Sequence, residues 1–400
     1  MNPVEKVSTS DIQAVLNKTF LWSKNQGMKG DNKHDALNSP VLSTLFGWHK
    51  WLRIIAIQGV MRFPVNLRSF LFVPKVYNPK GLSLFVIAYL DLFQESGDKK
   101  YLEEAKSLLQ LLSGIRSTGR WSGDCWGYAY PWQDPGFYAP AHMPNAVVSC
   151  FVAESFLRAY DVTGDTNYLD SVGSTLQFLF NDLPVLKKTN DELCLGYMPM
   201  PMSMRVMDVS ILIASIAIQY ATITNNEELK KTGERLLCYV LNQQTEYGAW
   251  FYTDPPEGSL IRHDNYHTGF ILDAFWKCMN TTSDWSMENK YYKGLDFYAK
   301  ELFNPDGSPR WMSDKDFPHD IHGAAQGIIT FSRHSDIYPG LAEKIATWAI
   351  THMYNSQGRF FYQQTRWYRK RFTLLRWCNA WMVRALSVLL LERKTANEKN

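Results

Sequence analysis

Apolar and polar positions follow a helical period along most of the 400 residues, and strand-like alternation is sparse. Three segments, beginning at residues 94, 161 and 222, repeat one pattern: a polar turn, an aromatic residue or leucine, and then an amphipathic helix. Weaker copies begin at residues 286 and 336. An aspartate or asparagine before the helix is suited to cap its first turn. The pattern therefore predicts an internal helical repeat, with a period of about 60 residues at first that shortens later.

A second, more apolar helix follows most of the amphipathic ones, after a loop that contains a glycine and an aromatic residue. The chain has six such apolar segments: 79–93, 146–160, 209–220, 269–279, 323–332 and 379–390. An apolar inner ring inside an amphipathic outer ring predicts an all-α fold, the (α/α)6 toroid of six helical hairpins. An open solenoid is the alternative. We favour closure because the fifth and sixth units lack a polar capping helix beyond them.

The toroid is expected to be one domain over residues 76–393, with an N-terminal helical extension over 1–75 packed on it and a frayed tail over 394–400. The extension mixes aromatic residues and leucines with four basic ones, Lys50, Arg53, Arg62 and Arg68. It either covers the toroid with its apolar face or, through residues 47–75, rests on an anionic membrane as a basic amphipathic segment.

Composition narrows the class of protein. The net charge of +3 gives little support for a nucleic-acid partner. The six cysteines lie far apart without a CxxC pair, which is typical of reduced thiols in the cytosol. No signal peptide is visible, and the longest apolar runs are shorter than the ~20 residues of a membrane span. We expect a soluble cytoplasmic protein, with peripheral contact to the inner membrane as the alternative.

Polar residues collect directly before the apolar helices. In a toroid all inner helices run the same way, so these junctions should converge at one mouth, where helix amino termini favour anionic ligands. The junctions cover residues 143–145, 205–208, 262–267, 319–322 and 374–377. The densest of them is RHDNYH, and HDIH repeats its theme. The candidate catalytic residues are His263, Asp264, Tyr266, His267, Asp320 and His322.

The loop WSGDCWGYAYPWQD, residues 121–134, leads into the second apolar helix and should line the same mouth. Tryptophan and tyrosine rings stack on the CH faces of sugars, and Arg376 is suited to clamp a carboxylate. The candidate substrate-binding residues are Asp124, Trp126, Tyr128, Trp132, Asn145, Trp250, Asn265, Trp311, Arg376 and Trp377. The structural alternatives are that Trp126 and Trp132 only brace the loops and that Asp264 or Asn265 only caps a helix.

Neither a metal nor another cofactor is expected. His263, His267, Cys125 and His322 could supply zinc ligands, but HExxH is absent and the two histidines of HDNYH straddle a helix start. The sequence also lacks a Walker loop, a GxGxxG element and a GxSxG element.

Residues 73–391 resemble a bacterial family found with surface-polysaccharide biosynthesis genes, whose members are often mislabelled as delta-aminolevulinic acid dehydratase. The matching elements are VPKVYNPKGLSL, GDCWGYAYPWQD, HDNYHTGFILDA, FPHDIHGAAQGIITF and LLRWCNAWMVRALS. That family is similar to the six-hairpin glycosidase superfamily of hydrolases, polysaccharide lyases and uronyl epimerases. The resemblance implies the toroid fold and a place in capsule or exopolysaccharide assembly. Asp134, followed by Pro135 and Gly136, departs from the family pattern and is a weaker candidate.

Three functions remain open at this point. The first is a lyase or C5-epimerase acting on a uronate-containing oligosaccharide or polysaccharide, lipid-linked or free, which needs a base, an acid and a group that neutralises the carboxylate. The second is an inverting glycoside hydrolase that uses Asp264 and Asp320, whose carboxyl groups would then lie about 6.5–9.5 Å apart. The third is a glycan-binding or scaffolding protein without catalysis.

Overall fold

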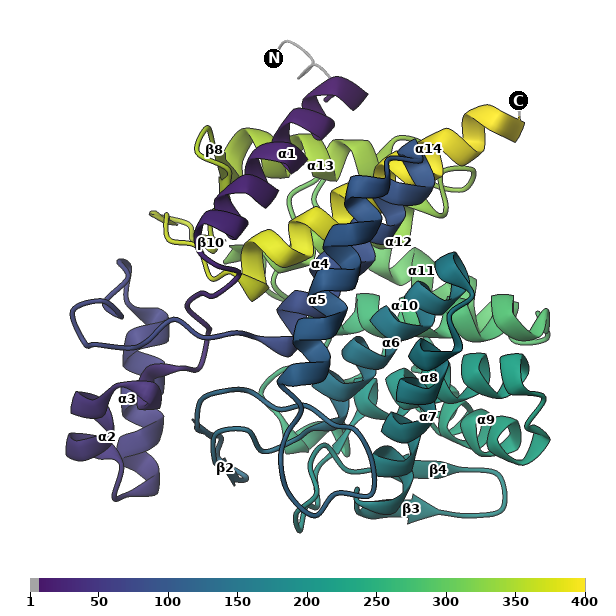
Figure 1. Cartoon of the computed structure of the whole chain (residues 1–400), viewed down its shortest axis with the longest axis horizontal. Helices are drawn as coiled ribbons and strands as arrows, with labels where there is room; N and C mark the ends of the chain where they lie inside the picture. The colour runs from purple at the N-terminus through teal and green to yellow at the C-terminus, as the bar shows by residue number, and fades with distance from the viewer. Residues whose placement is uncertain (1–6, 400) are drawn as a thin grey trace.

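Six apolar helices form the inner ring of an (α/α)6 toroid in the computed structural model, which describes residues 7–399 (Figure 1). They are α4 (Pro79–Ser96), α6 (Ala146–Thr163), α8 (Met207–Thr224), α10 (Asn265–Thr282), α12 (Ile321–Ser332) and α14 (Trp381–Lys399). The first five each contain a predicted apolar segment, and α14 contains all but the first two residues of the sixth, so the fold class is confirmed. Residues 1–6 of the predicted extension and residue 400 of the predicted tail lie outside the described part.

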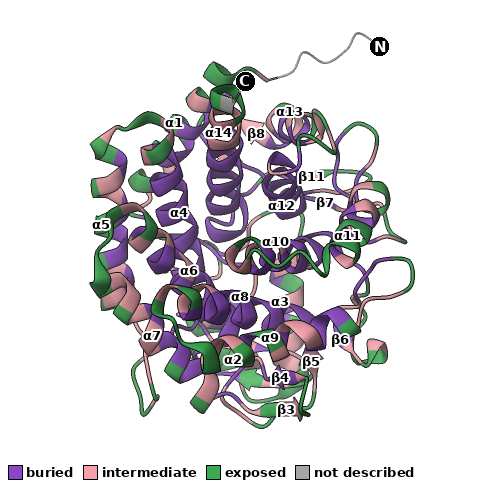
Figure 2. Cartoon of the chain, turned by 90° about the vertical axis from the view of Figure 1, so that its right-hand side faces the viewer, coloured by how far each residue is buried: buried purple, intermediate pink, exposed green. Residues whose placement is uncertain are grey.

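The inner helices are buried on nearly all sides, whereas outer helices such as α5 (Lys99–Gly114), α7 (Thr166–Asn181) and α11 (Glu288–Glu301) carry exposed faces (Figure 2). This division follows from the sequence, because the inner helices have apolar residues all round and the outer ones have a single apolar stripe. Among the described helices only α8 is long and apolar enough to cross a membrane, and 72% of that stretch is buried inside the protein.

Gly-Asp turns of the repeat join the first two inner helices, α4 and α6, to the outer helices that follow them. Gly97 ends α4 in the left-handed conformation, and the Asp98 side chain then accepts a hydrogen bond from the first turn of the next helix. Gly164 and Asp165 do the same after α6. Glycine adopts this conformation without a Cβ penalty, and aspartate is a favoured N-cap. The predicted caps are confirmed, and each turn folds a hairpin.

The outer ring consists of α5 (Lys99–Gly114), α7 (Thr166–Asn181), α9 (Glu227–Asn242), α11 (Glu288–Glu301), α13 (Leu341–Met353) and α1 (Thr9–Asn25). The first five come from the repeat. The sixth, α1, comes from the start of the chain and packs against α14 (Figure 1). Part of the predicted extension is therefore an integral outer helix of the ring.

Ion pairs around Asp91 connect α4 with its two neighbours in the ring, α6 and α14. Asp91 of α4 accepts hydrogen bonds from Arg384 of α14 at 2.5 Å and from Arg158 of α6 at 3.0 Å. Asp91 and Arg384 are buried, and α14 packs along α4. The first and last inner helices are thus neighbours, which excludes the open solenoid.

The strands of the described chain are short and pair the loops with one another. They are β1 (Trp132–Gln133), β2 (Tyr138–Ala139), β3 (Val185–Lys188), β4 (Leu193–Leu195), β5 (Arg205–Val206), β6 (Thr253–Asp254), β7 (His319–Asp320), β8 (Tyr354–Asn355), β9 (Arg359–Phe360), β10 (Gln363–Gln364) and β11 (Arg369–Lys370). Antiparallel pairing of β10 with β7 puts Gln363 opposite Asp320, and β5 pairs with β6. These pairs hold together the loops that lead into inner helices.

An N-terminal lobe, defined as residues 36–72, lies beside the ring (Figure 1). It contains η1 (Ala36–Asn38), α2 (Pro40–Phe46) and α3 (Lys50–Arg62); the other short turn, η2 (Pro256–Gly258), precedes α10. The lobe has its own small core of Ala36, Leu37, Leu42, Ala56, Ile57 and Val60. Arg68 is buried in a 2.7 Å ion pair with Asp35, and Arg53 donates a 2.8 Å hydrogen bond to Gln133 in the aromatic loop. The lobe is therefore anchored beside the loop that leads into α6.

Candidate functional site

Residues from the amino-terminal ends of different inner helices meet at one end of the ring. The Tyr266 ring of α10 stacks on His322 of α12 with centroids 4.6 Å apart, and His322 meets the edge of Trp377 at 4.6 Å. Trp377 belongs to η3 (Arg376–Ala380), a π-helical turn directly before α14. Such turns are frequent at functional sites. The central cluster comprises Lys80, Asp208, Asp264, Tyr266, His267, Asp320, His322, Arg376 and Trp377.

Asp264 and His267 form a hydrogen-bonded pair at the start of α10. Asp264 precedes the helix, but its carboxylate makes no cap; Oδ2 instead lies 2.7 Å from Nδ1 of His267. Asp264 is almost fully buried, whereas the His267 side chain is partly exposed. The contact with Asp264 uses Nδ1, so the other ring nitrogen of His267, Nε2, is not engaged by this carboxylate. A carboxylate that holds Nδ1–H leaves Nε2 as the basic nitrogen, which is the arrangement of a general base.

His322 is buried without a hydrogen bond to either ring nitrogen in the described chain. Its ring lies between Tyr266 and Trp381, whose centroid is 4.4 Å away. Burial lowers the pKa of His322 well below its usual range, and the charges of Lys80 and Arg376 add to this effect. The imidazole is therefore neutral. Leaving buried polar atoms unpaired costs about 1–3 kcal/mol, so such groups indicate a functional role for the position.

Asp320 has both carboxylate oxygens occupied. Oδ1 accepts hydrogen bonds from Trp377 Nε1 at 2.7 Å and from the His322 backbone N–H at 3.0 Å, and Oδ2 accepts one from Gln363 at 2.8 Å. Burial raises the pKa of Asp320, and the charge of Lys33 opposes this rise. These bonds fix the position of the Trp377 ring, so Asp320 is a positioning group.

Three basic side chains lie on aromatic rings at the site: Arg376 and Lys80, which belong to the central cluster, and Lys33 beside it. The guanidinium of Arg376 lies 4.8 Å from the Trp377 ring, and its buried Nε has no described partner. Lys80 Nζ lies 3.9 Å from the ring of Phe151, and burial lowers its pKa well below the usual range. Lys33 Nζ lies 3.9 Å above Trp377, and burial lowers its pKa to about 8, with Asp320 opposing the shift. Cations on aromatic faces can bind a carboxylate.

Half-buried aromatic residues surround the cluster. Trp311 lies 6.2 Å from Tyr266, and Tyr128 lies 5.6 Å beneath the guanidinium of Arg376. Trp132 stacks on His34 at 5.5 Å and packs against the core of the N-terminal lobe. The structure thus brings Tyr128 and Trp311 to the central cluster, whereas Trp132 connects the aromatic loop to the lobe.

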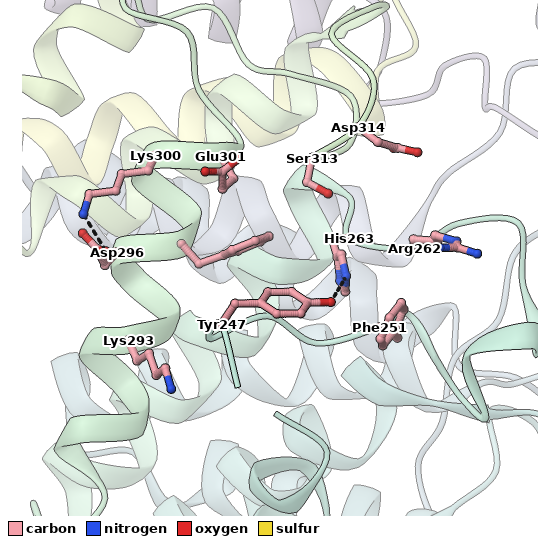
Figure 3. A pocket seen from close by; sticks show the side chains of 11 residues that line it. Tyr247, Phe251, Arg262, His263, Lys293, Asp296, Lys300, Glu301, Ser313 and Asp314 are labelled. Carbon is pink, nitrogen blue, oxygen red and sulfur yellow. Dashed lines mark hydrogen bonds and ion pairs between the residues drawn. The ribbon is translucent and has the colours of Figure 1, made fainter. Parts of the chain in front are cut away.

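The structure does not bring His263 into the cluster. It lines a separate cavity of about 660 Å³ bordered by α11, in which its Nε2 faces the Tyr247 hydroxyl at 3.0 Å (Figure 3). Its Nδ1 lies 2.9 Å from the carbonyl oxygen of Trp250. Both nitrogens are therefore occupied, and the side chain joins the residues directly before α10 to the loop that follows α9.

Three more predicted residues make contacts that hold the scaffold together. Asn265 donates to the carbonyl of Leu302 at 2.7 Å and accepts from the Tyr298 hydroxyl, so it attaches α10 to α11. Trp126 and Trp250 are fully buried, and each indole N–H donates to a carbonyl of the preceding outer helix, at 2.8 and 3.0 Å. This geometry matches the alternative interpretation of Trp126, in which the side chain only braces its loop.

Asp124 and Asn145 likewise make structural contacts outside the central cluster. Asp124 forms a 2.9 Å ion pair with Arg116. Asn145 is buried and caps α6 by accepting a hydrogen bond from the Val148 backbone N–H. Asp124 therefore attaches the aromatic loop to the segment after α5, and Asn145 stabilises the start of α6.

Lys33, Lys80 and Asp208 belong to the site although sequence reasoning did not select them. Burial raises the pKa of Asp208, the charges of His267 and Lys80 oppose the rise, and its Oδ1 has no partner in the described residues. Lys80 and Asp208 could have been found, because each is an ionisable residue in the first turn of an apolar helix. Lys33 comes from the chain before the repeat, where no periodic signal places it.

No three His, Cys, Asp or Glu side chains within residues 7–399 are grouped so that they could hold a metal ion. The cysteines of the described chain are unpaired, and Cys125 and Cys378 are buried. Burial raises the pKa of Cys125 to about 12, so its thiol is a poor metal ligand.

No protein-family model matches the chain, and no curated protein sequence matches it. Solved structures with the same fold do exist. Cellobiose 2-epimerase from Bacillus thermoamylovorans B4167 superposes with a TM-score of 0.61 at 11% identity, over 80% of this chain and 90% of that one.

Two further structures align along nearly the whole chain. A polysaccharide lyase superposes with a TM-score of 0.60 at 12% identity, over 98% of this chain and 99% of its own. A family 88 glycosyl hydrolase from Bacteroides vulgatus gives 0.60 at 11% identity, over 97% and 99%. These likenesses establish the fold, which enzymes of three carbohydrate chemistries share.

Proposed function

We propose that the protein is a carbohydrate-active enzyme that removes the C5 proton of a uronate unit in a glycan, as a lyase or a C5-epimerase. The observation that carries the proposal is the Asp264–His267 pair, with the Tyr266 ring 4.3 Å from His267 and Arg376 in the same cluster. Proton abstraction next to a carboxylate needs a base, an acid and a cation that stabilises the developing negative charge.

His267 is the base in this proposal and Tyr266 is the acid. His267 Nε2 takes the C5 proton, and the electron pair of the broken C–H bond moves into the carboxylate, which Arg376 and Lys33 stabilise. Burial raises the pKa of Tyr266 well above its usual range, and the charges of Asp264 and Asp320 raise it further. The phenol therefore stays protonated and can donate its proton.

The two outcomes differ in where that proton goes. In a lyase it reaches the oxygen at C4 as the C4–O bond breaks and a C4=C5 double bond forms. In an epimerase it reaches C5 from the opposite face. The hydrolase alternative has less support, because hydrogen bonds to Trp377 and Gln363 occupy Asp320 and His267 occupies Asp264.

The biological setting is part of the proposal and rests on the sequence resemblance alone. We propose that the reaction serves capsule or exopolysaccharide assembly in the cytoplasm. The likeness to an epimerase, a lyase and a hydrolase supports a glycan as the substrate class without selecting the sugar.

The test is incubation of the purified chain with uronate-containing oligosaccharides in deuterated water. Ultraviolet absorbance of a 4,5-unsaturated uronate identifies a lyase, and deuterium at C5 without chain cleavage identifies an epimerase. New reducing ends without unsaturation would show a hydrolase, and binding without turnover a glycan-binding protein; either result contradicts the proposal.

A further inference from the structure

The N-terminal lobe and the β10–β11 hairpin expose large apolar side chains to water. Trp48, Phe70 and Phe72 of the N-terminal lobe are 75%, 80% and 69% exposed, and Trp367 of the β10–β11 hairpin is 83% exposed. Further exposed members are Leu45, Trp51, Ile55, Phe63, Val65 and Tyr368. Monomeric soluble proteins rarely gather so many large apolar side chains, and an accumulation of this kind marks an interaction site. We name these ten residues the apolar face.

Helix α3 shows how the face is built. Its inward side contributes Ala56, Ile57 and Val60 to the core of the lobe. Its outward side presents Trp51 and Ile55, one helical turn apart, and Arg62 two turns further on. An ordinary surface helix is polar on the outward side. This helix is apolar on both sides, with a cation at the end.

The β10–β11 hairpin extends the apolar face from a segment about 300 residues away in sequence. Lys370 Nζ donates a 3.2 Å hydrogen bond to the carbonyl of Met61 near the end of α3. The hairpin and the lobe lie on the same side of the ring (Figure 1). Trp367 and Tyr368 at its tip therefore belong to the surface that includes Phe63.

The two segments that carry the apolar face contain basic residues and no acidic ones, although Asp134 of the aromatic loop lies near enough to Lys50 to interact with its charge. Residues 36–75 contain five lysines and arginines and no aspartate or glutamate, and residues 363–371 contain four and none. The chain as a whole has only three more basic than acidic residues, so the two segments are strongly biased. Exposed cations at the face are Lys50, Arg62, Arg366 and Arg371.

We propose that the apolar face docks on a membrane that contains anionic lipids. Tryptophan and phenylalanine enter the headgroup boundary of a bilayer, and lysine and arginine are attracted to its negative surface. A second copy of the chain fits less well, because a symmetric contact would bring two predominantly positive surfaces together. This assignment goes beyond the proposed reaction and does not depend on it.

The apolar face is connected to the candidate site. Arg53 of α3 donates to Gln133 at 2.8 Å, and its guanidinium lies 4.7 Å from the Tyr138 ring. The same aromatic loop supplies Tyr128, beneath Arg376. A docked protein would therefore hold the aromatic loop close to the lipid headgroups. If the proposed function holds, a glycan attached to a lipid carrier fits this arrangement.

Flotation of the full chain with vesicles tests the assignment without any turnover. We expect binding to vesicles of phosphatidylglycerol and phosphatidylcholine in equal parts, weaker binding at high salt, and little binding to phosphatidylcholine alone. The triple variant Phe70→Ser, Phe72→Ser, Trp367→Ser should bind at least about tenfold more weakly. The control Leu260→Ser removes an exposed apolar side chain elsewhere and should not change binding.

A second set of variants changes charge and leaves the apolar residues in place. Arg62→Glu with Arg366→Glu and Arg371→Glu should abolish the preference for anionic vesicles. The matched control reverses three exposed lysines outside the face, Lys99, Lys188 and Lys231. Because all substituted side chains are exposed, melting temperatures should stay near that of the parent chain.

Several results would overturn the proposal. Equal binding to neutral and anionic vesicles would do so, as would the absence of binding to either. So would a dimer, seen by sedimentation, that the apolar-face variants dissociate while vesicle binding is absent. If the apolar-face variants lost binding to a soluble polyuronate and kept binding to vesicles, the surface would be a glycan-binding site instead.

Discussion

The Nδ1 atom of His267 lies 2.7 Å from Oδ2 of Asp264, three residues earlier at the amino-terminal end of α10. His263, only four residues from His267, faces the Tyr247 hydroxyl in a different cavity. Two histidines of one short motif thus have different surroundings, and this difference can be tested directly.

His267→Gln should lower kcat by about 10²–10⁴-fold, because it removes the proposed base. Asp264→Asn should also lower kcat, since the neutral amide can donate to Nδ1 and so favour the tautomer that carries its proton on Nε2. The matched variant His263→Gln should leave kcat near the parent value and lower the free energy of unfolding by about 1 kcal/mol, since it alters two hydrogen bonds. Steady-state kinetics and urea unfolding measure both. A large loss of kcat in His263→Gln with normal turnover in His267→Gln would reverse the assignment.

Lys33 should give the reaction a pH dependence on the alkaline side. Burial lowers its pKa to about 8, so the amine is cationic below this pH and neutral above it. Attraction for a substrate carboxylate is therefore present below about pH 8 and is lost as the pH rises through that value. In the Lys33→Arg variant kcat/KM should stay high to more alkaline pH, because arginine remains charged. An unchanged alkaline limb in this variant would show that another group titrates.

His322→Leu should lower turnover, because it removes the ring that stacks on the proposed acid Tyr266, and should keep or raise stability. Both ring nitrogens of His322 are buried and unpaired in the described chain. Leucine, of similar size, removes these polar atoms and should raise the free energy of unfolding by up to about 1 kcal/mol. The matched variant is His334→Leu. His334 is also buried but faces the Tyr291 hydroxyl at 2.6 Å, so its removal should cost about 1–3 kcal/mol. Equal losses in the two unfolding curves would mean that His322 is a structural residue.

Gly358→Ala should loosen α1 from the ring. Gly358 has a φ of +87°, and an added Cβ would lie 2.2 Å from the carbonyl oxygen of Lys18 in α1. The control Gly97→Ala has a similar φ of +73° with open space around it, so it should cost only the strain of about 1–2 kcal/mol. Hydrogen exchange of residues 12–23 should accelerate in Gly358→Ala alone. Unchanged exchange there would show that α1 tolerates the displacement.

The sequence was informative wherever the repeat was regular. The apolar segments located all six inner helices, and their junctions indicated that Tyr266, His322 and Arg376 would meet, as the geometry shows. A position near a helix start, however, does not give the direction of a side chain. Successive residues there point to different sides, so His263 faces α11 while His267 faces the cluster.

Contacts made by the first 75 residues were not predictable in the same way. Nothing in their pattern shows that α1 would fill the sixth outer position or that Lys33 would lie on Trp377. Both contacts join segments more than 300 residues apart and depend on closure of the whole ring. Trp126 and Trp250 lie in a regular loop motif, which predicted that they would bind substrate. Their indole N–H groups instead donate to carbonyl groups of outer helices, a contact that the motif does not reveal.

The pairing of α1 with α14 sets an order of events during synthesis. A ribosome makes α1 first, and its partner only after the other five hairpins have been translated. Until then Phe20 of α1 can stack on Tyr89 of α4, but the inner helix that α1 covers does not yet exist. The neighbouring hairpins can form one after another as they emerge, since their contacts are local. The last inner helix must then enter between α4 and α12, and α1, made before the five hairpins, covers it.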